Sequence, residues 1–280
     1  MSRVEPTHTL VQISDPHLVP EGELLRGRVD TGGALARTLA VVEESGVRPD
    51  ALVFTGDLVD GGDAASYRRF RALVEPVARR LGAEVVLVAG NHDRRAALRE
   101  HLLDLPPDPA PLDRVLRIGG LRLVVLDTTV PGRSHGGLRP SQLERLAAEL
   151  AVPAPDGTVL ALHHPPLPTA LPLTAAIELR AADRAALAAV LAGSDVRLVL
   201  AGHTHVVSAG AVGGVPVWTG GATSYGSDAL APDRGERVLL APSASRVDLF
   251  PDALIVTSVT VGPQVAATFT GAQVRAMLPG

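Results

Sequence analysis

The chain has 280 residues, enough for one large domain or two small ones, and its 46% hydrophobic content can fill a substantial core. It contains no cysteine, which excludes disulfides and thiolate-bound zinc or iron–sulfur sites, so any metal must be held by histidine, carboxylate, amide or water. The formal net charge of -4 shows no overall bias toward nucleic acid or anionic lipid.

The N-terminal segment, residues 1–14, lacks the basic start, apolar stretch and cleavage site of a signal peptide. No part of the sequence approaches the ~18 consecutive apolar residues that a membrane-spanning helix needs. We therefore expect a cytoplasmic protein without a membrane span.

Six short apolar runs predict β-strands, and the segments between them predict helices. Because both faces of each run are apolar, the runs are typical of a sheet that helices cover. The expected strands lie at 9–14, 51–56, 84–90, 121–128, 158–164 and 196–202, and the expected helices at 31–44, 64–81, 94–103, 141–150 and 182–192. This alternation predicts an α/β layered domain.

Two of the expected helices carry a start signal, and one carries a breaker. Asp63 precedes the helix at 64–81, and Ser141 is followed three residues later by Glu144, as in a capping box. Pro76 lies inside the helix at 64–81, where its missing N–H predicts a kink or a break.

The C-terminal part changes to strand-rich sequence with tight turns. Residues 206–226 and 246–262 predict strands, the second stretch a hairpin around 250–252. The sequence shows no linker and no repeat. We therefore expect a single domain over residues 1–280 whose C-terminal part, about 206–270, completes a second sheet.

Three proline-rich segments, 105–111, 152–157 and 165–172, predict surface loops. The last one directly follows two histidines and is expected to form one wall of a site. Loops such as 165–172 and 219–228 would decide which substrate fits, because pocket shape sets specificity.

Polar residues cluster where five of the six apolar runs end. They are Asp15 and His17; Asp57 and Asp60; Asn91, His92 and Asp93; His163 and His164; and His203 and His205. In open α/β sheets, ligands bind outside the carboxyl ends of strands, so these side chains should converge on one edge. Each cluster alone could be a helix cap, a turn or a buried histidine, but five at one edge predict a functional site.

His203 and His205 are two residues apart, and in an extended segment both rings would point the same way. Together the clusters offer seven metal-ligand candidates: Asp15, His17, Asp57, Asn91, His163, His203 and His205. A structural zinc needs only four ligands, whereas this larger set suits two ions that share a carboxylate. Nitrogen and oxygen donors without thiolate favour zinc, manganese or iron.

In this order, the motifs resemble those of the calcineurin-like binuclear metallophosphoesterases. The motifs SDPHL, FTGDL, AGNHD, LALHHPPLP and LAGHTH are most similar to those of the actinobacterial class III cyclic-AMP phosphodiesterases, and the similarity continues through APLDRV, LDTTVPG and PAPDGT. The resemblance implies an α/β fold: a four-layer αββα sandwich, with two mixed β-sheets flanked by helices.

The resemblance also implies residue roles. One metal would be held by Asp15, His17, Asp57 and His205, and the other by Asp57, Asn91, His163 and His203. His92 would protonate or stabilise the departing oxygen and be held by Asp93, while Asp60 would orient a ligand or a metal-bound water. Substrate contacts are expected from Asn91, His92, His205 and, in a loop after the fourth strand, His135, whereas His164 is expected to be structural.

One position departs from the family pattern, since relatives often have threonine where this chain has Pro16. Proline removes an N–H and pushes Asp15 toward extended backbone angles. We expect the metal site to survive, although the hydrogen bond of the usual threonine is lost.

The function implied is hydrolysis of 3′,5′-cyclic nucleotides, cyclic AMP to 5′-AMP, by a hydroxide bridging two metal ions. Iron and manganese are the expected ions, with zinc or cobalt as alternatives. Rival functions are a glycerophosphodiesterase or broad-specificity phosphodiesterase, and, outside enzymes, a metal-binding scaffold or sensor.

A protein phosphatase is disfavoured because Gly61 and Gly62 follow Asp60 where that branch has arginine. A nuclease is disfavoured because no basic stripe marks a nucleic-acid track. The expected partner is a small phosphodiester, and relatives suggest a homodimer.

Overall fold

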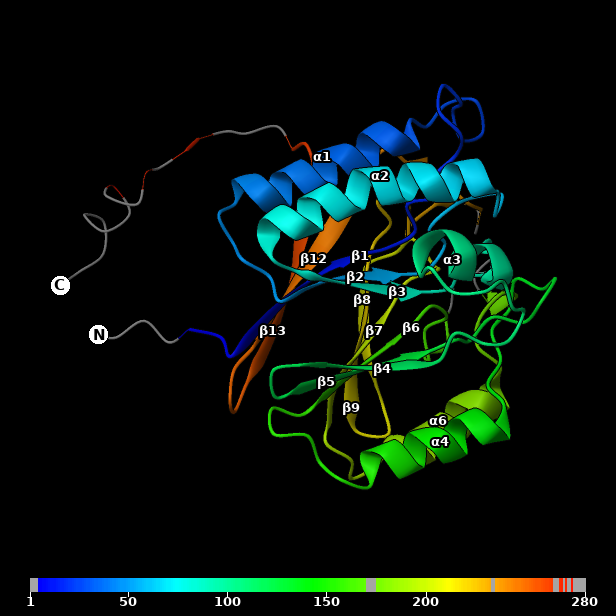
Figure 1. Cartoon of the computed structure of the whole chain (residues 1–280), viewed down its shortest axis with the longest axis vertical. Helices are drawn as coiled ribbons and strands as arrows, with labels where there is room; N and C mark the ends of the chain where they lie inside the picture. The colour runs from blue at the N-terminus through cyan, green and yellow to red at the C-terminus, as the bar shows by residue number, and fades with distance from the viewer. Residues whose placement is uncertain are drawn as a thin grey trace.

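The computed structural model describes residues 5–169, 175–232 and 235–263, together with 267, 268, 270 and 273. Two β-sheets pack face to face, and helices cover both outer faces (Figure 1). The predicted four-layer sandwich with two mixed sheets is therefore confirmed. Among the residues that the structure describes, no helix combines the length and apolar character needed to cross a bilayer.

The first sheet has the strand order β13-β12-β1-β2-β3. Its parallel core consists of β1 (His8–Ile13), β2 (Ala51–Thr55) and β3 (Glu84–Val88), and β12 (Ser243–Leu249) and β13 (Leu254–Thr260) extend it as an antiparallel hairpin. Helices α1 (Thr31–Glu44), α2 (Ala64–Leu81) and α3 (Arg95–Leu102) belong to this half of the molecule (Figure 1).

The second sheet has the order β4-β5-β6-β7-β9-β8. Its parallel strands are β5 (Leu121–Leu126), β6 (Thr158–Leu162), β7 (Val196–Ala201) and β9 (Val215–Thr219), with antiparallel β4 (Arg114–Ile118) and β8 (Ser208–Val212) at the edges. Helices α4 (Pro140–Leu150) and α6 (Ala181–Leu191) cover it, and a short pair, β10 (Gly226–Ser227) and β11 (Val238–Leu239), stands apart.

Strand residues alternate between two buried layers, which explains why the runs are apolar on both faces. In β2, Ala51 and Val53 belong to the core between the sheets, whereas Leu52 and Phe54 pack with α1 and α2. Burial of both faces gives each strand about 25 cal/mol for every Å² of apolar surface removed from water.

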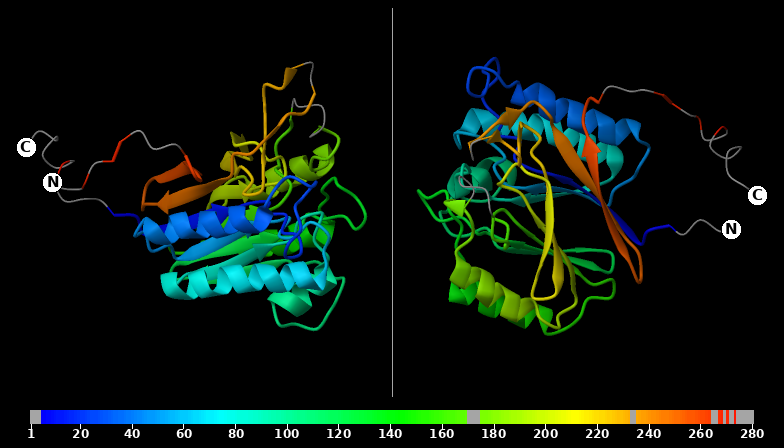
Figure 2. Two further views of the ribbon diagram at one scale, coloured as in Figure 1. Left: turned by 90° about the horizontal axis from the view of Figure 1, so that it is seen from above. Right: turned by 180° about the vertical axis from the view of Figure 1, so that it is seen from behind.

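The C-terminal expectation requires a correction. The hairpin at 250–252 is found, but β12 pairs with β1 and so completes the first sheet, while only β8 and β9 extend the second one. Figure 2 shows this hairpin beside the N-terminal strand. Sequence reasoning missed this pairing because residues 233 to 241 positions apart leave no local signal, and it also missed β4.

Two helix details differ from expectation. Asp63 caps helix α2 as expected, because its carboxylate accepts the Ser66 N–H at 2.9 Å. Against expectation, the helix continues through Pro76 without a break. Helix α4 begins at Pro140, so Ser141 is not its cap; instead the Gln142 side chain accepts the Arg139 N–H at 3.0 Å. Proline suits the first helical position because its missing N–H would have no partner there.

The proline-rich segments 105–111 and 152–157 have no regular helix or strand. Of the third segment, 165–172, the last three residues lie outside the described residues.

Candidate metal centre

The polar clusters follow directly after β1, β2, β3, β6 and β7, at the carboxyl ends of the parallel strands. Among the described residues, four groups of three ligand atoms lie within 4.8 Å of one another there: Asp15, His17 and His205; Asp15, Asp57 and His163; His17, Asp57 and His92; and His163, His164 and His203. The structure thus gathers side chains from both sheets at one point.

The first group of donor atoms surrounds His17. Its Nε2 lies 3.2 Å from the His205 Nε2 and 3.5 Å from the Asp57 Oδ2, and the His205 Nε2 lies 3.5 Å from an oxygen of Asp15. Asp15, His17, Asp57 and His205 are all buried. Four nitrogen and oxygen donors therefore face one small volume.

The second group surrounds His163. Its Nε2 lies 3.0 Å from the His203 Nδ1, 3.1 Å from the Asn91 Oδ1 and 3.5 Å from the Asp57 Oδ2. The same carboxylate oxygen of Asp57 thus lies 3.5 Å from a histidine of each group. Asp57 stands between the groups, where a bridging ligand would have to be.

The outer ring nitrogens set the tautomers of these histidines. The Nδ1–H groups of His163 and His205 donate to the Thr55 and Tyr225 carbonyls at 2.8 and 2.9 Å. The Nε2–H of His203 donates to the Ile177 carbonyl at 3.0 Å. Because a carbonyl can only accept, the inner nitrogen of each neutral ring carries a lone pair.

Two lone pairs that face one another at about 3 Å repel unless a proton or a metal cation lies between them. The Asp57 carboxylate is ionised. Although burial opposes ionisation, His163 and His17 hold the pKa of Asp57 well below its usual range. Burial, reinforced by His163, lowers the pKa of His203 to about 3, so its ring is neutral near pH 7. Although burial opposes it, the Asp57 carboxylate raises the pKa of His163 to about 9. Buried carboxylate and imidazole donors are the ligands that zinc, manganese and iron accept, so the residues fit metal ions.

Five of the candidate ligands have left-handed backbone, with φ between 44° and 73°: Asp15, His17, Asp57, His203 and His205. Non-glycine residues rarely adopt such angles, and each costs about 1–3 kcal/mol unless its surroundings impose it. The extended backbone expected for Asp15 and for 203–205 is therefore wrong. Because His203 and His205 both have left-handed backbone, their rings do not point the same way. The His203 ring lies beside His163, and the His205 ring lies beside His17.

Tertiary hydrogen bonds hold Asp15 in this conformation despite Pro16. Its N–H donates to the Gly56 carbonyl at 3.2 Å, and its own carbonyl accepts the Ser224 hydroxyl at 2.7 Å. Its carboxylate accepts the His203 N–H at 2.9 Å.

The glycines of the motifs are required by close approach. A Cβ at Gly90 would lie 2.1 Å from the Asp57 backbone nitrogen, and one at Gly202 would lie 2.6 Å from an Asp15 carboxylate oxygen. At Gly56, where φ is +97°, it would lie 2.2 Å from the His163 Nδ1.

A buried chain of hydrogen bonds leads from between the sheets to Asp15. The Gln12 amide donates to the Thr55 hydroxyl at 3.0 Å, which donates to the Ser14 hydroxyl at 2.7 Å, and Ser14 donates to the Asp15 carboxylate. Because the Gln12 NH₂ group can only donate, each hydroxyl in this row of hydrogen bonds donates toward the Asp15 carboxylate. It orients Asp15 and stabilises its charge.

His92 is held by Asp60 and not by Asp93 as expected. Its Nδ1–H donates to the Asp60 carbonyl at 2.9 Å, and a carboxylate oxygen of Asp60 lies 3.3 Å away. This contact, despite partial burial, raises the pKa of His92 to about 9. Asp60 also accepts from the His17 Nδ1 at 3.1 Å, so one carboxylate orients both rings.

Asp93 instead holds loop backbone together. Its carboxylate accepts the N–H groups of Leu58 and Gly90 at 3.1 and 2.8 Å and the Tyr67 hydroxyl at 3.0 Å. It therefore joins the loops after β2 and β3, which carry Asp57 and Asn91.

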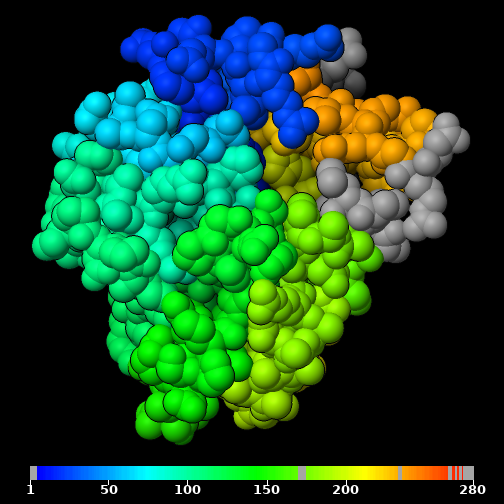
Figure 3. All heavy atoms as spheres, turned by 90° about the vertical axis from the view of Figure 1, so that its right-hand side faces the viewer, coloured from blue at the N-terminus to red at the C-terminus, as the bar shows by residue number. Residues whose placement is uncertain are grey.

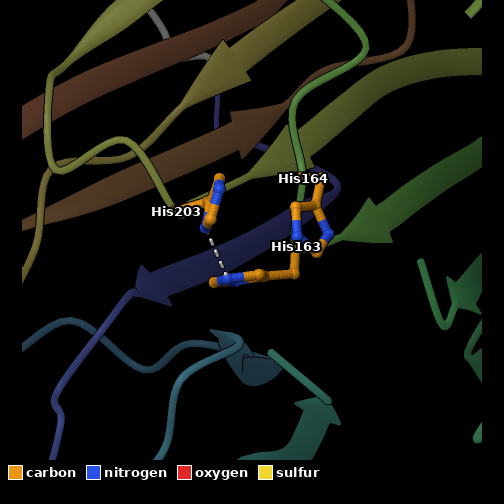
Figure 4. A group of neighbouring side chains, drawn as sticks. All are labelled: His163, His164 and His203. Carbon is orange, nitrogen blue, oxygen red and sulfur yellow. Dashed lines mark hydrogen bonds between the residues drawn. The ribbon is translucent and has the colours of Figure 1, made fainter. Parts of the chain in front are cut away.

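Two further histidines have partners of their own, although the ligand atom of His164 lies within 4.8 Å of those of His163 and His203. Figure 4 shows a hydrogen bond between His163 and His203 but none from either to His164. Both nitrogens of His164 are used elsewhere, by the Thr128 hydroxyl at 2.8 Å and the Ser134 carbonyl at 3.2 Å. His135 lies 3.5 Å from Arg180 and does not line the pocket over the ligand groups.

A pocket opens over the ligand groups, and its walls include residues that sequence reasoning missed. These are Arg26, Ser134, Ile177, Thr204, Tyr225, Ser227 and Glu236. Figure 3 shows the N-terminal part of the chain (blue) and a C-terminal part (orange) on neighbouring sides of a hollow in this face. Tyr225 lies in the loop 219–228 that was expected to shape the pocket, but no sequence pattern marks Arg26.

Comparison with known proteins agrees with this geometry. The family model "Calcineurin-like phosphoesterase" matches residues 8–207. A cAMP/cGMP dual specificity phosphodiesterase of Mycobacterium tuberculosis is 50% identical over 258 residues, which cover 92% of this chain and 80% of that protein. A probable glycerophosphodiester phosphodiesterase of Arcobacter nitrofigilis is 30% identical over 202 residues, 71% of this chain and 72% of that protein.

Among solved structures, a dimetal phosphatase from Danio rerio superimposes with a TM-score of 0.65, covering 92% of this chain and 99% of that one at 17% sequence identity. At this identity the likeness concerns the fold alone.

Proposed function

The chain belongs to the calcineurin-like phosphoesterase family, and on this basis we propose that it is a metal-dependent phosphodiesterase that hydrolyses 3′,5′-cyclic nucleotides. The observation that carries the proposal is the Asp57 carboxylate, which lies 3.5 Å from a histidine of each donor group. The similar phosphodiesterase of M. tuberculosis supports the choice of substrate.

Two ions are proposed, one held by Asp15, His17, Asp57 and His205, the other by Asp57, Asn91, His163 and His203. When bound, such ions lower the pKa of water and neutralise charge on the phosphoryl oxygens. Iron and manganese are proposed as the ions, with zinc or cobalt as alternatives, because the donors are nitrogen and oxygen without sulfur.

The role proposed for His92 is to supply a proton. Its Nδ1 is bound by Asp60, and its Nε2 makes no hydrogen bond to any residue that the structure describes. The pKa of about 9 keeps the ring protonated at neutral pH. In hydrolysis of cyclic AMP, a water oxygen bonds to phosphorus and one proton of that water passes to solvent. The bond to the 3′ oxygen breaks, and His92 gives its proton to that oxygen to leave 5′-AMP.

Asn91 and His205 also line the pocket and are proposed to contact the phosphate. Asp93 is proposed to act as a positioning residue through Gly90 and Leu58. The single domain over 1–280, the homodimer, the cytoplasmic location and the substrate contact of His135 stay predictions.

Glycerophosphodiesters are the second candidate substrate, because the enzyme of A. nitrofigilis shares 30% identity. A kinetic panel after metal reconstitution separates the two functions. It compares kcat/KM for cyclic AMP, cyclic GMP, 2′,3′-cyclic AMP, a glycerophosphodiester and an aryl monoester. A higher kcat/KM for the glycerophosphodiester than for either 3′,5′-cyclic nucleotide would overturn the proposal.

The variants Asn91→Ala and His203→Ala test the site itself. Each should lose most turnover while unfolding at a temperature close to that of the wild-type protein. Near-normal rates in metal-replete variants would contradict the ligand assignment.

A further inference from the structure

The pocket over the ligand groups contains one arginine among the described residues that line it, Arg26. Its guanidinium carbon lies 5.3 Å from the centroid of the Tyr225 ring, within the range of a cation–π contact. The side chain makes no ion pair or hydrogen bond with any residue that the structure describes, although Glu236 lines the same pocket. Its donors are therefore available to a ligand.

The turn that presents Arg26 is rigidly built. Leu25 and Val29 exchange two backbone hydrogen bonds at 2.9 and 3.0 Å, and both side chains pack with Val19 and Tyr225 in a small apolar cluster. Arg26 has a φ of 52°, an unusual angle for a residue with a side chain.

A second anchor holds the start of this loop. The Arg69 guanidinium on α2 donates to the carbonyls of Val19 and Pro20 at 2.7 and 3.1 Å. Arg26 itself is exposed, but the turn fixes its backbone and the Tyr225 ring lies against its guanidinium, which reduces the entropy lost when a ligand binds.

The position of Arg26 relative to the ligand groups suggests what it contacts. The Tyr225 ring lies 4.4 Å from the His205 ring, so a single aromatic ring separates the guanidinium from a candidate metal ligand. If the phosphate of a cyclic nucleotide lies at the ligand groups, the part of the nucleotide that reaches past the Tyr225 ring to Arg26 is the base.

The chemistry of guanidinium selects among bases. It offers a fork of N–H donors and no acceptor. Guanine presents two acceptors, O6 and N7, on one edge, whereas adenine presents one acceptor beside a donor. Glu236 can accept hydrogen bonds from N–H groups on the opposite edge of guanine.

We propose that Arg26, seated on Tyr225, forms a subsite for the purine base of a 3′,5′-cyclic nucleotide and favours guanine over adenine. The proposal rests on the proposed function, because it assumes that the phosphate lies at the ligand groups. It deepens that function by assigning base recognition to a residue outside the catalytic motifs.

The test uses the full chain reconstituted with Mn²⁺ and Fe²⁺, and compares Arg26→Ala and Arg26→Lys with wild type. Substrates are cyclic GMP, cyclic AMP and the base-free methyl riboside 3′,5′-cyclic phosphate. Arg26→Ala should lower kcat/KM for cyclic GMP by ~10- to 100-fold, as expected for loss of a bidentate contact to guanine. The loss should be smaller for cyclic AMP and smallest for the base-free diester, and lysine, which lacks the fork, should restore little.

Arg28 gives a matched control, since it is an exposed arginine of the same turn that does not line the pocket. Arg28→Ala should match wild type on all three substrates. Calorimetric affinity for 5′-GMP, compared with ribose 5-phosphate, gives a second readout that does not depend on turnover, and thermal unfolding verifies that the variants fold.

Equal losses on all three substrates would place Arg26 on the phosphate and overturn the proposal, as would an unchanged rate on cyclic GMP. If wild type cleaves the base-free diester but neither cyclic nucleotide, the proposed function fails as well, and the two failures are thereby distinguished.

Discussion

The close approach of Gly90 to Asp57 makes a sharp test of how the metal centre is held. The substitution Gly90→Ala adds a Cβ that would lie 2.1 Å from the Asp57 backbone nitrogen and 2.2 Å from its Oδ1. Ordinary contact begins near 3.4 Å, so the ends of β2 and β3 must separate by more than 1 Å. The nearest of these atoms is a backbone nitrogen, which cannot move aside as the far end of a flexible side chain could.

The expected loss follows from that displacement. Overpacking of this kind costs about 1–3 kcal/mol of stability. The larger effect is on chemistry, because a misplacement of about 1 Å in a catalytic group can cost roughly 100-fold in rate. The shift also threatens the hydrogen bond from the His92 N–H to the Asp57 Oδ1, at 2.8 Å. We expect kcat/KM for cyclic AMP to fall by about that factor and metal affinity to fall with it.

The assay combines metal content by mass spectrometry, kcat/KM and thermal unfolding. Gly61→Ala is the matched control, because a Cβ there would meet only the Asp63 carboxylate at an ordinary 3.6 Å. If Gly90→Ala binds as much metal as wild type and keeps its kcat/KM, the close approach does not position Asp57, and the reasoning is refuted.

Three further predictions concern stability and ligand identity. Thr55→Val should cost about 1–3 kcal/mol in urea unfolding, because one N–H of the buried Gln12 amide loses its acceptor while the other keeps the Ala201 carbonyl. Stability equal to wild type would contradict the row of hydrogen bonds, and Thr55→Ser is the control. Asp63→Ala should cost about 1 kcal/mol at pH 7 by loss of the α2 cap. Despite partial burial, the hydrogen bond from Ser66 lowers the pKa of Asp63 in the folded state. The stabilisation is therefore present above the ordinary Asp pKa and is lost as pH falls through the lowered pKa of the folded state. An equal difference in unfolding free energy between wild type and Asp63→Ala at pH 7 and at pH 3 would disprove this account. His164→Gln should keep the wild-type metal content in mass spectrometry while His203→Ala loses metal, and metal loss from His164→Gln would make His164 a ligand.

Much of the architecture was predictable because its signals are local. The helix at 31–44 and the helix at 64–81 were placed at their observed bounds, since apolar spacing and the Asp63 cap lie within the segments themselves. The apolar runs likewise predicted both buried faces of the central strands. The positions of polar residues after strand ends then placed the candidate ligands at one edge.

Other features needed the folded chain. Nothing near 243–260 indicates that this hairpin pairs with β1, because the pairing is decided by the open edge of the first sheet. The exchange of Asp93 for Asp60 as the partner of His92 follows from loop packing, since Asp93 is already occupied by backbone N–H groups.

By itself, the sequence determined most of the helices and parallel strands, the chemical types of the candidate ligands and the family to which the chain belongs, but not β4. Tertiary structure alone decided which backbone angles the candidate ligands adopt, which carboxylate holds His92 and which arginine reaches the pocket. The physical reason is that left-handed φ at residues such as Asp15 and His203 runs against local preference, and only contacts between distant segments can impose it.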